Sequence, residues 1–101
     1  MKRTDPNNRQ QQILTAALKL AVTHGYTNVT REALADRCHI SPALVSHYFG
    51  TMALLRRAII GEAIRTENLD IILQGIAAKD TRACGISDEL RVRVMQHAMN
   101  V

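Results

Sequence analysis

The sequence predicts an all-α protein, and three observations support this fold class. The chain has 101 residues, of which 47% are hydrophobic and only 3% aromatic, so an aliphatic core is expected. Apolar residues recur at intervals of three and four in several segments, which is the spacing of one helix face. Capping residues, proline and glycine separate these segments. At this length we expect one small domain.

The first helix is predicted over residues 8–24. Asn8 and Gln11 have the spacing of a capping box. Gly25 follows the last periodic residue and predicts a left-handed helix end.

Two shorter helices are predicted next. Thr30 is a favourable N-cap for a helix over about residues 31–38. Ser41 followed by Pro42 combines a side-chain cap with proline at the first helical position, which predicts a third helix over residues 42–48.

The second half of the chain is also predicted to be helical. Thr51 can cap a fourth helix that reaches about Thr66, and residues 69–78 form an apolar helical segment. Residues 79–86 include a glycine and are predicted to be a loop. Ser87 then caps a last helix.

The charge distribution suggests different partners for the two halves. The net charge is +4. Residues 1–65 hold nine Lys and Arg against four Asp and Glu, whereas residues 66–101 hold four against five. A basic front half favours a polyanionic partner. We divide the chain into a flexible basic arm (1–7), a head (8–50), and a helical linker and dimerisation region (51–101).

The head contains a segment with the dimensions of a helix-turn-helix. Two short helices are joined by a tight turn over residues 39–41, and compact residues on the second helix would allow it to enter a DNA major groove. Ser46 and His47 can hydrogen-bond base edges, and Ala43 and Leu44 can contact thymine methyl groups. The predicted base contacts are Pro42, Ala43, Leu44, Ser46 and His47.

Several short strings resemble one family of regulators. His24-Gly25-Tyr26, Leu34-Ala35, Ile40-Ser41 and the string Ser46-His47-Tyr48-Phe49 are similar to the DNA-binding domain of tetracycline-repressor-type (TetR) regulators. The string VSHYFG is especially close to the choline- and betaine-responsive branch. The resemblance covers about residues 9–65 and implies a three-helix DNA-binding head, followed by a fourth helix leading into a dimerising body.

The resemblance also implies where DNA phosphates bind. Carried over by position, the starts of the second and fourth helices would hold phosphates through Thr30, Arg31 and Thr51. Ser41 is first a cap and second a phosphate contact. The hydroxyl of Tyr48 either binds phosphate or leaves its ring packed against the first helix, and both roles are compatible.

Three residues depart from the family pattern. His39 stands where the turn has glycine, Ser46 where the recognition helix often has tyrosine, and Met52 where the fourth helix begins with a characteristic lysine. The loss of that lysine removes a phosphate contact, for which Arg56 and Arg57 are candidate replacements. Family members are also about twice as long, so the chain is either a naturally short form, which the capped last helix favours, or a fragment.

The rear helices carry more apolar residues than a three-helix head needs to cover. They either cap the head within one chain or form a homodimer interface, and a helix-turn-helix protein usually reads two half-sites. The predicted interface residues are Ile72, Ile76, Leu90, Val94, Met95 and Ala98.

Other classes of function lack support in the sequence. Cys38 and Cys84 match no metal motif and no disulfide framework. No membrane-length apolar run or signal peptide is present, so a reducing cytoplasm is expected. We identify no paired carboxylates, phosphate-binding glycine loop or nucleophile–base pair. We therefore expect no enzyme, no metal, no cofactor and no ordinary small-molecule inducer pocket.

The functional prediction is a sequence-specific repressor that binds a pseudo-palindromic operator as a homodimer. The alternative is a protein-interaction module, such as an antirepressor or the heterodimer partner of a regulator. The modest net charge and Met52 favour this alternative.

Overall fold

The computed structural model describes residues 6–100 of the chain, and this part contains helices and turns without a strand. In chain order the elements are α1 (Pro6–His24), the 3-10 turn η1 (Tyr26–Asn28), α2 (Arg31–Cys38), α3 (Pro42–Phe49), α4 (Met52–Arg65), α5 (Leu69–Ala77), α6 (Thr81–Cys84) and α7 (Asp88–Met99). The predicted all-α class is confirmed.

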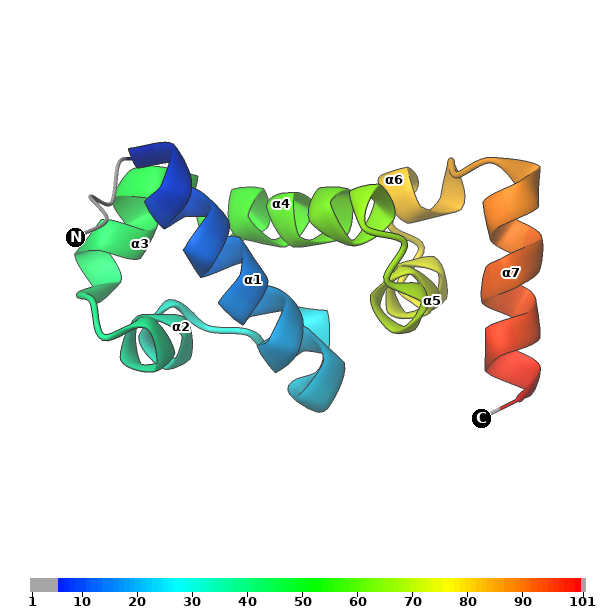
Figure 1. Cartoon of the computed structure of the whole chain (residues 1–101), viewed down its shortest axis with the longest axis horizontal. Coiled ribbons are helices and arrows are strands. Elements are labelled where there is room, and N and C mark those ends of the chain that lie inside the picture. Colours follow the sequence, from blue (N-terminus) through cyan, green and yellow to red (C-terminus); the bar gives the residue numbers. More distant parts are fainter. Residues whose placement is uncertain (1–5, 101) are drawn as a thin grey trace.

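The helices form two groups joined lengthwise by α4 (Figure 1). The head, α1 to α3, lies at one end of a molecule whose longest dimension is 41 Å. The C-terminal helices α5 to α7 lie at the other end, and α7 forms the outer edge. The helix expected to read DNA is therefore far from the outer face of α7.

One continuous aliphatic core runs through both groups. Its members are at most 9% exposed, and α4 contributes Leu55, Ile59 and Ile60 to its centre. In the head the buried residues are Ile13, Ala17, Ala21, Tyr26, Val29, Leu34, Ala35, Val45 and Phe49. The amphipathic spacing of the sequence thus places one face of each helix in the core.

Close helix packing explains a glycine in the middle of α5. A Cβ atom added to Gly75 would lie 2.7 Å from the Cβ of Ala83 and 2.9 Å from Cδ1 of Ile60. Glycine disfavours a helix interior, and here it allows α4, α5 and α6 to approach one another.

Two predictions about the first helix were wrong. Helix α1 begins at Pro6, two residues before the predicted start, because proline is well suited to the first helical turn. Residues 1–5 of the predicted arm lie outside the described residues. Gly25 has a positive φ of 92° but a ψ of 137°, so it precedes η1 in a conformation outside the left-handed helical region.

The predicted loop over residues 79–86 contains the short helix α6. The carboxylate of Asp80 accepts hydrogen bonds from the backbone N–H groups of Arg82 and Ala83 at 2.9 and 3.1 Å. This N-cap starts a single helical turn, which was missed because four residues show no periodicity.

Candidate nucleic-acid interface

Helices α2 and α3 form a helix-turn-helix with a capped start at each helix. Thr30 Oγ1 accepts from the N–H of Ala33 at 3.1 Å, and Ser41 Oγ accepts from the N–H of Leu44 at 3.1 Å. Side-chain caps of this kind satisfy N–H groups that lack a partner within the helix. The two predicted caps therefore determine where both helices begin.

The turn between them depends on a left-handed residue. His39 has φ 59° and ψ 43°, a conformation that costs less for glycine and asparagine than for most side chains. Its N–H donates to Asp36 O at 3.3 Å, and the N–H of Ile40 donates to Ala35 O at 3.0 Å. This is the hydrogen-bond pattern of a Schellman motif, so the turn forms here with histidine in the position that glycine usually occupies.

Helix α3 presents one face to solvent and buries the other. Val45 and Phe49 are in the core, whereas Pro42, Ala43 and His47 are exposed. Leu44 and Ser46 are half-buried. The five residues expected to contact bases thus all retain accessible surface.

Tyr48 has the packing role that the sequence offered, and its phosphate contact stays a prediction. It is half-buried and packs against the core, and its ring meets that of His47 edge-on, with centroids 5.4 Å apart. This contact limits the orientations of His47 on the exposed face of α3.

The serine and the two threonines expected at phosphates are exposed helix caps. Besides Thr30 and Ser41, Thr51 Oγ1 accepts from the N–H of Leu54 at 3.2 Å. A hydroxyl that accepts a hydrogen bond still has its own proton to donate. All three can therefore cap a helix and donate to a phosphate oxygen together.

A hollow of about 320 Å³ lies between the start of α2, η1 and α4. We call it the α2–α4 notch, and its lining residues are Thr27, Asn28, Val29, Thr30, Arg31, Glu32, Met52 and Arg56. It brings together both helix starts that the resemblance assigns to phosphates.

Two arginines in the α2–α4 notch have unsatisfied donors. The Nε atoms of Arg31 and Arg56 are buried and have no hydrogen-bond partner among the described residues. Arg56 also donates from Nη2 to Thr27 O at 3.5 Å. Unpaired buried donors on cations are costly, and the two guanidinium groups bring positive charge to the lining of the notch.

Arg56 was not among the residues assigned to phosphate from the sequence. It appeared there only as a candidate replacement for the lysine missing at Met52. The available signal was its position one helical turn after Met52, because residues four apart share a helix face. Glu32 also lines the notch and is exposed at its rim, where its charge opposes that of the arginines.

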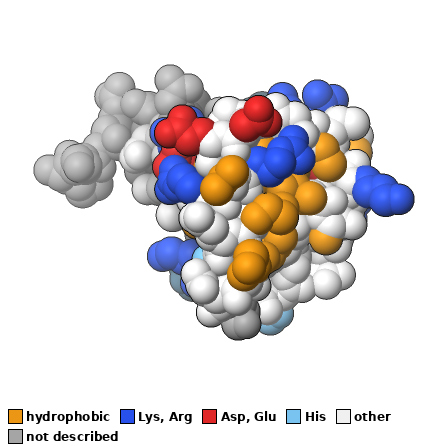
Figure 2. Space-filling model, turned by 90° about the vertical axis from the view of Figure 1, so that its right-hand side faces the viewer, with side chains coloured by type: hydrophobic (Ala, Val, Ile, Leu, Met, Phe, Trp, Pro, Cys, Tyr) orange, Lys and Arg blue, Asp and Glu red, His pale blue; other side chains and the backbone are white. Residues whose placement is uncertain are grey.

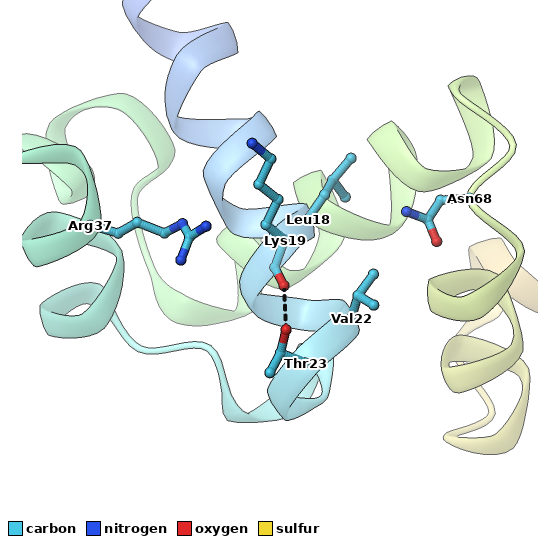
Figure 3. Close-up of a pocket in the computed structure, with 6 residues that line it drawn as sticks. All are labelled: Leu18, Lys19, Val22, Thr23, Arg37 and Asn68. Atoms are coloured by element: carbon cyan, nitrogen blue, oxygen red, sulfur yellow. Dashed lines mark hydrogen bonds between the residues drawn. The ribbon is translucent and has the colours of Figure 1, made fainter.

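A second hollow, of about 360 Å³, lies on another surface (Figure 3). Leu18 and Val22 of α1 point toward Asn68, and Arg37 of α2 reaches toward Lys19. Asn68 is already engaged as the cap of α5, accepting from the N–H of Ile71 at 3.2 Å.

The predicted dimer residues separate into two sets. Ile72, Leu90 and Val94 are buried within the chain, which leaves at most 9% of each exposed. They pack α5 and α7 against each other. Met95 is 39% exposed, and Ile76 and Ala98 are half-buried.

None of the helices within residues 6–100 has the length and hydrophobicity of a membrane span. The same residues contain no cluster of three or more His, Cys, Asp or Glu suited to a metal ion.

Comparison with known proteins agrees with this geometry. A family model described as bacterial regulatory proteins, tetR family, matches residues 13–59. The HTH-type transcriptional regulator BetI of Agrobacterium fabrum is 33% identical over 82 residues, which cover 81% of this chain and 37% of that relative. The chain thus matches little more than a third of BetI, and no solved structure matches it significantly. The matched region includes the whole helix-turn-helix, and residues 13–59 of this chain match the tetR family of bacterial regulatory proteins.

Proposed function

We propose that this protein represses transcription by occupying an operator as a homodimer. One observation carries the proposal. Helix α3 has an exposed face, and the helices before and after it in the chain line a notch that contains two arginines with unpaired donors. Base edges would be read by α3, and the notch would hold the DNA backbone. The family assignment supports a DNA-binding regulator, and the repressor role is our inference.

Base reading is assigned to the exposed surface of α3. His47 and Ser46 would hydrogen-bond to base edges, while Pro42, Ala43 and Leu44 would make close apolar contacts. The small side chains at the start of α3 allow its backbone to approach the floor of the major groove.

Backbone binding is assigned to the helix starts and the α2–α4 notch. Thr30, Ser41, Thr51 and Tyr48 would donate from hydroxyl groups, and Arg31 would donate from its guanidinium. Arg56 compensates for Met52, because its guanidinium supplies charge in the same notch.

The outer face of α7 is the surface we assign to the second copy (Figure 2). Val92, Met95 and Met99 are 54%, 39% and 83% exposed, and their spacing of three and four residues forms one apolar stripe. Figure 2 shows a row of hydrophobic side chains at this end of the molecule. An isologous contact would pair two such stripes.

The size of this stripe predicts a weak dimer in free solution. Helix α7 has 12 residues, so the footprint of one helix face is roughly 200 Å². Stable interfaces bury about 800 Å² on each partner. We therefore expect the two copies to assemble mainly when both occupy half-sites about 34 Å apart.

Relief of repression is proposed to occur without an ordinary inducer pocket. The two hollows are at the low end of the volumes of small-molecule sites. Dilution, proteolysis or a protein partner would then release the DNA. A thermal shift with a small hydrophobic ligand, coupled to loss of DNA binding, would contradict this part of the proposal.

The decisive experiment is fluorescence anisotropy with DNA from upstream of the protein's own gene. A scrambled duplex is the control, at about 150 mM salt, where specific and non-specific binding are well separated. We expect a preference of about 10³ or more for the upstream DNA.

The opposite result would favour the interaction module. If neither this duplex nor a library of genomic fragments is bound specifically, the operator-binding proposal is wrong. The replacement of lysine by Met52 and the presence of Glu32 in the notch would then explain the loss.

A further inference from the structure

Gln74 of α5 makes a pair of hydrogen bonds to the backbone of the head. Its Nε2 donates to Ala21 O at 3.0 Å, and its Oε1 accepts from the N–H of Tyr26 at 2.7 Å. Ala21 lies in the last turns of α1, and Tyr26 is the first residue of η1. The amide therefore bridges the turn at Gly25, from a helix about 50 residues further along the chain.

The turn η1 is held from three directions. Within the head, Asn28 Nδ2 donates to His24 O at 2.7 Å. From α4, Arg56 Nη2 donates to Thr27 O at 3.5 Å. The contact from α5 is the one through Gln74, so η1 is the place where the C-terminal helices meet the start of the helix-turn-helix.

The same turn forms a wall of the α2–α4 notch. Thr27 and Asn28 of η1 line this hollow together with Thr30, which caps α2. A shift of η1 would therefore change the spacing between Arg56 on α4 and the start of α2. Base-reading residues on α3 are not part of this wall.

We infer that Gln74 is a positioning residue for DNA backbone binding. It holds η1 at the distance from α4 at which the α2–α4 notch accepts a phosphate, and so couples the C-terminal helices to the affinity of the head. This inference rests on the proposed DNA-binding function. It adds that α5, which packs on α7, influences the affinity for DNA through the side-chain amide of Gln74.

The chemistry of the amide explains why this residue is suited to the task. An uncharged amide supplies one acceptor and two donors, which are needed by the N–H of Tyr26 and the carbonyl of Ala21. Methionine has a similar size and supplies neither strong group. Glutamate keeps the acceptor for Tyr26 but places a carboxylate against the carbonyl oxygen of Ala21.

The hydrogen bonds of Gln74 to the head are tested on the free protein by amide hydrogen exchange. In Gln74→Met the N–H of Tyr26 loses its acceptor, and we expect its exchange to accelerate by roughly tenfold or more, while core amides of α4 change less. Unchanged exchange at Tyr26 would overturn the inference without bearing on whether the protein binds DNA.

The functional consequence is tested by anisotropy on specific and scrambled duplexes. Gln74→Met should weaken binding to both by a similar factor of about 5 or more, because the notch contacts backbone rather than bases. Equal affinity of Gln74→Met and wild type for both duplexes would overturn the inference. Absence of DNA binding by the wild type would instead overturn the proposed function.

A matched control separates positioning from general stability. Ile71 lies on the same helix and is fully buried, and its side chain makes no hydrogen bond. Ile71→Val should lower thermal stability and leave the affinity of the folded protein unchanged. If Ile71→Val weakens DNA binding as much as Gln74→Met does, Gln74 has only a structural role. Gln74→Glu should show an intermediate exchange rate at Tyr26, because the acceptor is retained.

Discussion

His47 is the exposed residue of α3 with the strongest capacity to read a base, since its imidazole can donate and accept. We expect His47→Ala to weaken specific binding by about 1–3 kcal/mol and to leave non-specific binding nearly unchanged. Anisotropy on operator and scrambled duplexes measures both. Equal losses on the two duplexes would show that His47 contacts backbone instead.

Replacing Arg56, unlike replacing His47, should weaken specific and non-specific DNA binding alike. Arg56→Gln keeps part of the side chain in the α2–α4 notch but removes the charge, so binding to both duplexes should weaken. The slope of log affinity against log salt should fall in magnitude by about 0.9, which corresponds to one phosphate.

Arg57 provides a matched control for this measurement. It is the next residue of α4, is exposed, and does not line the notch. Arg57→Gln removes the same charge and should change the salt slope less. If both variants change the slope equally, the notch is not a localised phosphate site.

At the scale of elements, Glu62 connects α1 to α4. Its side chain is 7% exposed, accepts from Gln11 Nε2 at 2.8 Å, and accepts from Arg65 at 2.6 and 2.9 Å. Hydrogen bonds from Arg65 lower the pKa of this carboxyl, against the opposing effect of burial, and Gln11 lowers it further.

The lowered pKa of Glu62 predicts an acid dependence of stability. A carboxyl whose folded pKa is below its unfolded value, about 4.3, stabilises the fold above that pH. This contribution is lost as pH falls through the folded value. Glu62→Gln should therefore lower the free energy of unfolding by about 1 kcal/mol at pH 7. The difference from wild type should shrink below about pH 4, as measured by urea unfolding.

The control for this prediction is an exposed carboxyl. Glu89 on α7 has no ion pair among the described residues, and Glu89→Gln should not reproduce the change in acid dependence. A constant difference between Glu62→Gln and wild type across this pH range would contradict the role of Glu62.

At the scale of the whole molecule, dimer formation can be tested by a substitution in the outer stripe of α7. Met95 is 39% exposed in one chain, so Met95→Glu should leave the fold of the single chain intact. Burying a carboxylate between two stripes is unfavourable, so the variant should lose cooperative binding to adjacent half-sites. Anisotropy on duplexes with one and two half-sites measures this loss.

Thr15→Glu is the control for added charge. Thr15 is exposed on α1, in the head rather than among the C-terminal helices, so cooperativity between half-sites should persist. Retained cooperativity in Met95→Glu would place the contact between copies elsewhere.

Much of the local structure could be predicted because it depends on neighbouring residues. Thr30, Ser41, Thr51 and Ser87 were identified as caps from the sequence, and each accepts from the N–H three residues later. The left-handed geometry of His39 is also a local property, because the tight turn that ends α2 requires a left-handed residue at this position. The family resemblance was confirmed for the same region.

Other features depend on residues far apart in the chain. From the sequence, Ile72, Leu90 and Val94 were predicted to form one interface with Met95, since all four are apolar residues in predicted helices. Their separation into an inner set and an outer stripe required the packing of α7 on α5. The short helix α6 was missed because its start depends on one cap at Asp80.

The sequence by itself determined the helical class, the helix-turn-helix and the family, because caps, periodicity and turn residues act within a few positions. Only the tertiary structure decided that Arg31 and Arg56 meet in one notch and that Gln74 supports the turn η1. These groups are brought together by the packing of α1, α4 and α5. Contacts between residues about 25 to 50 positions apart leave no periodic signal in a single sequence.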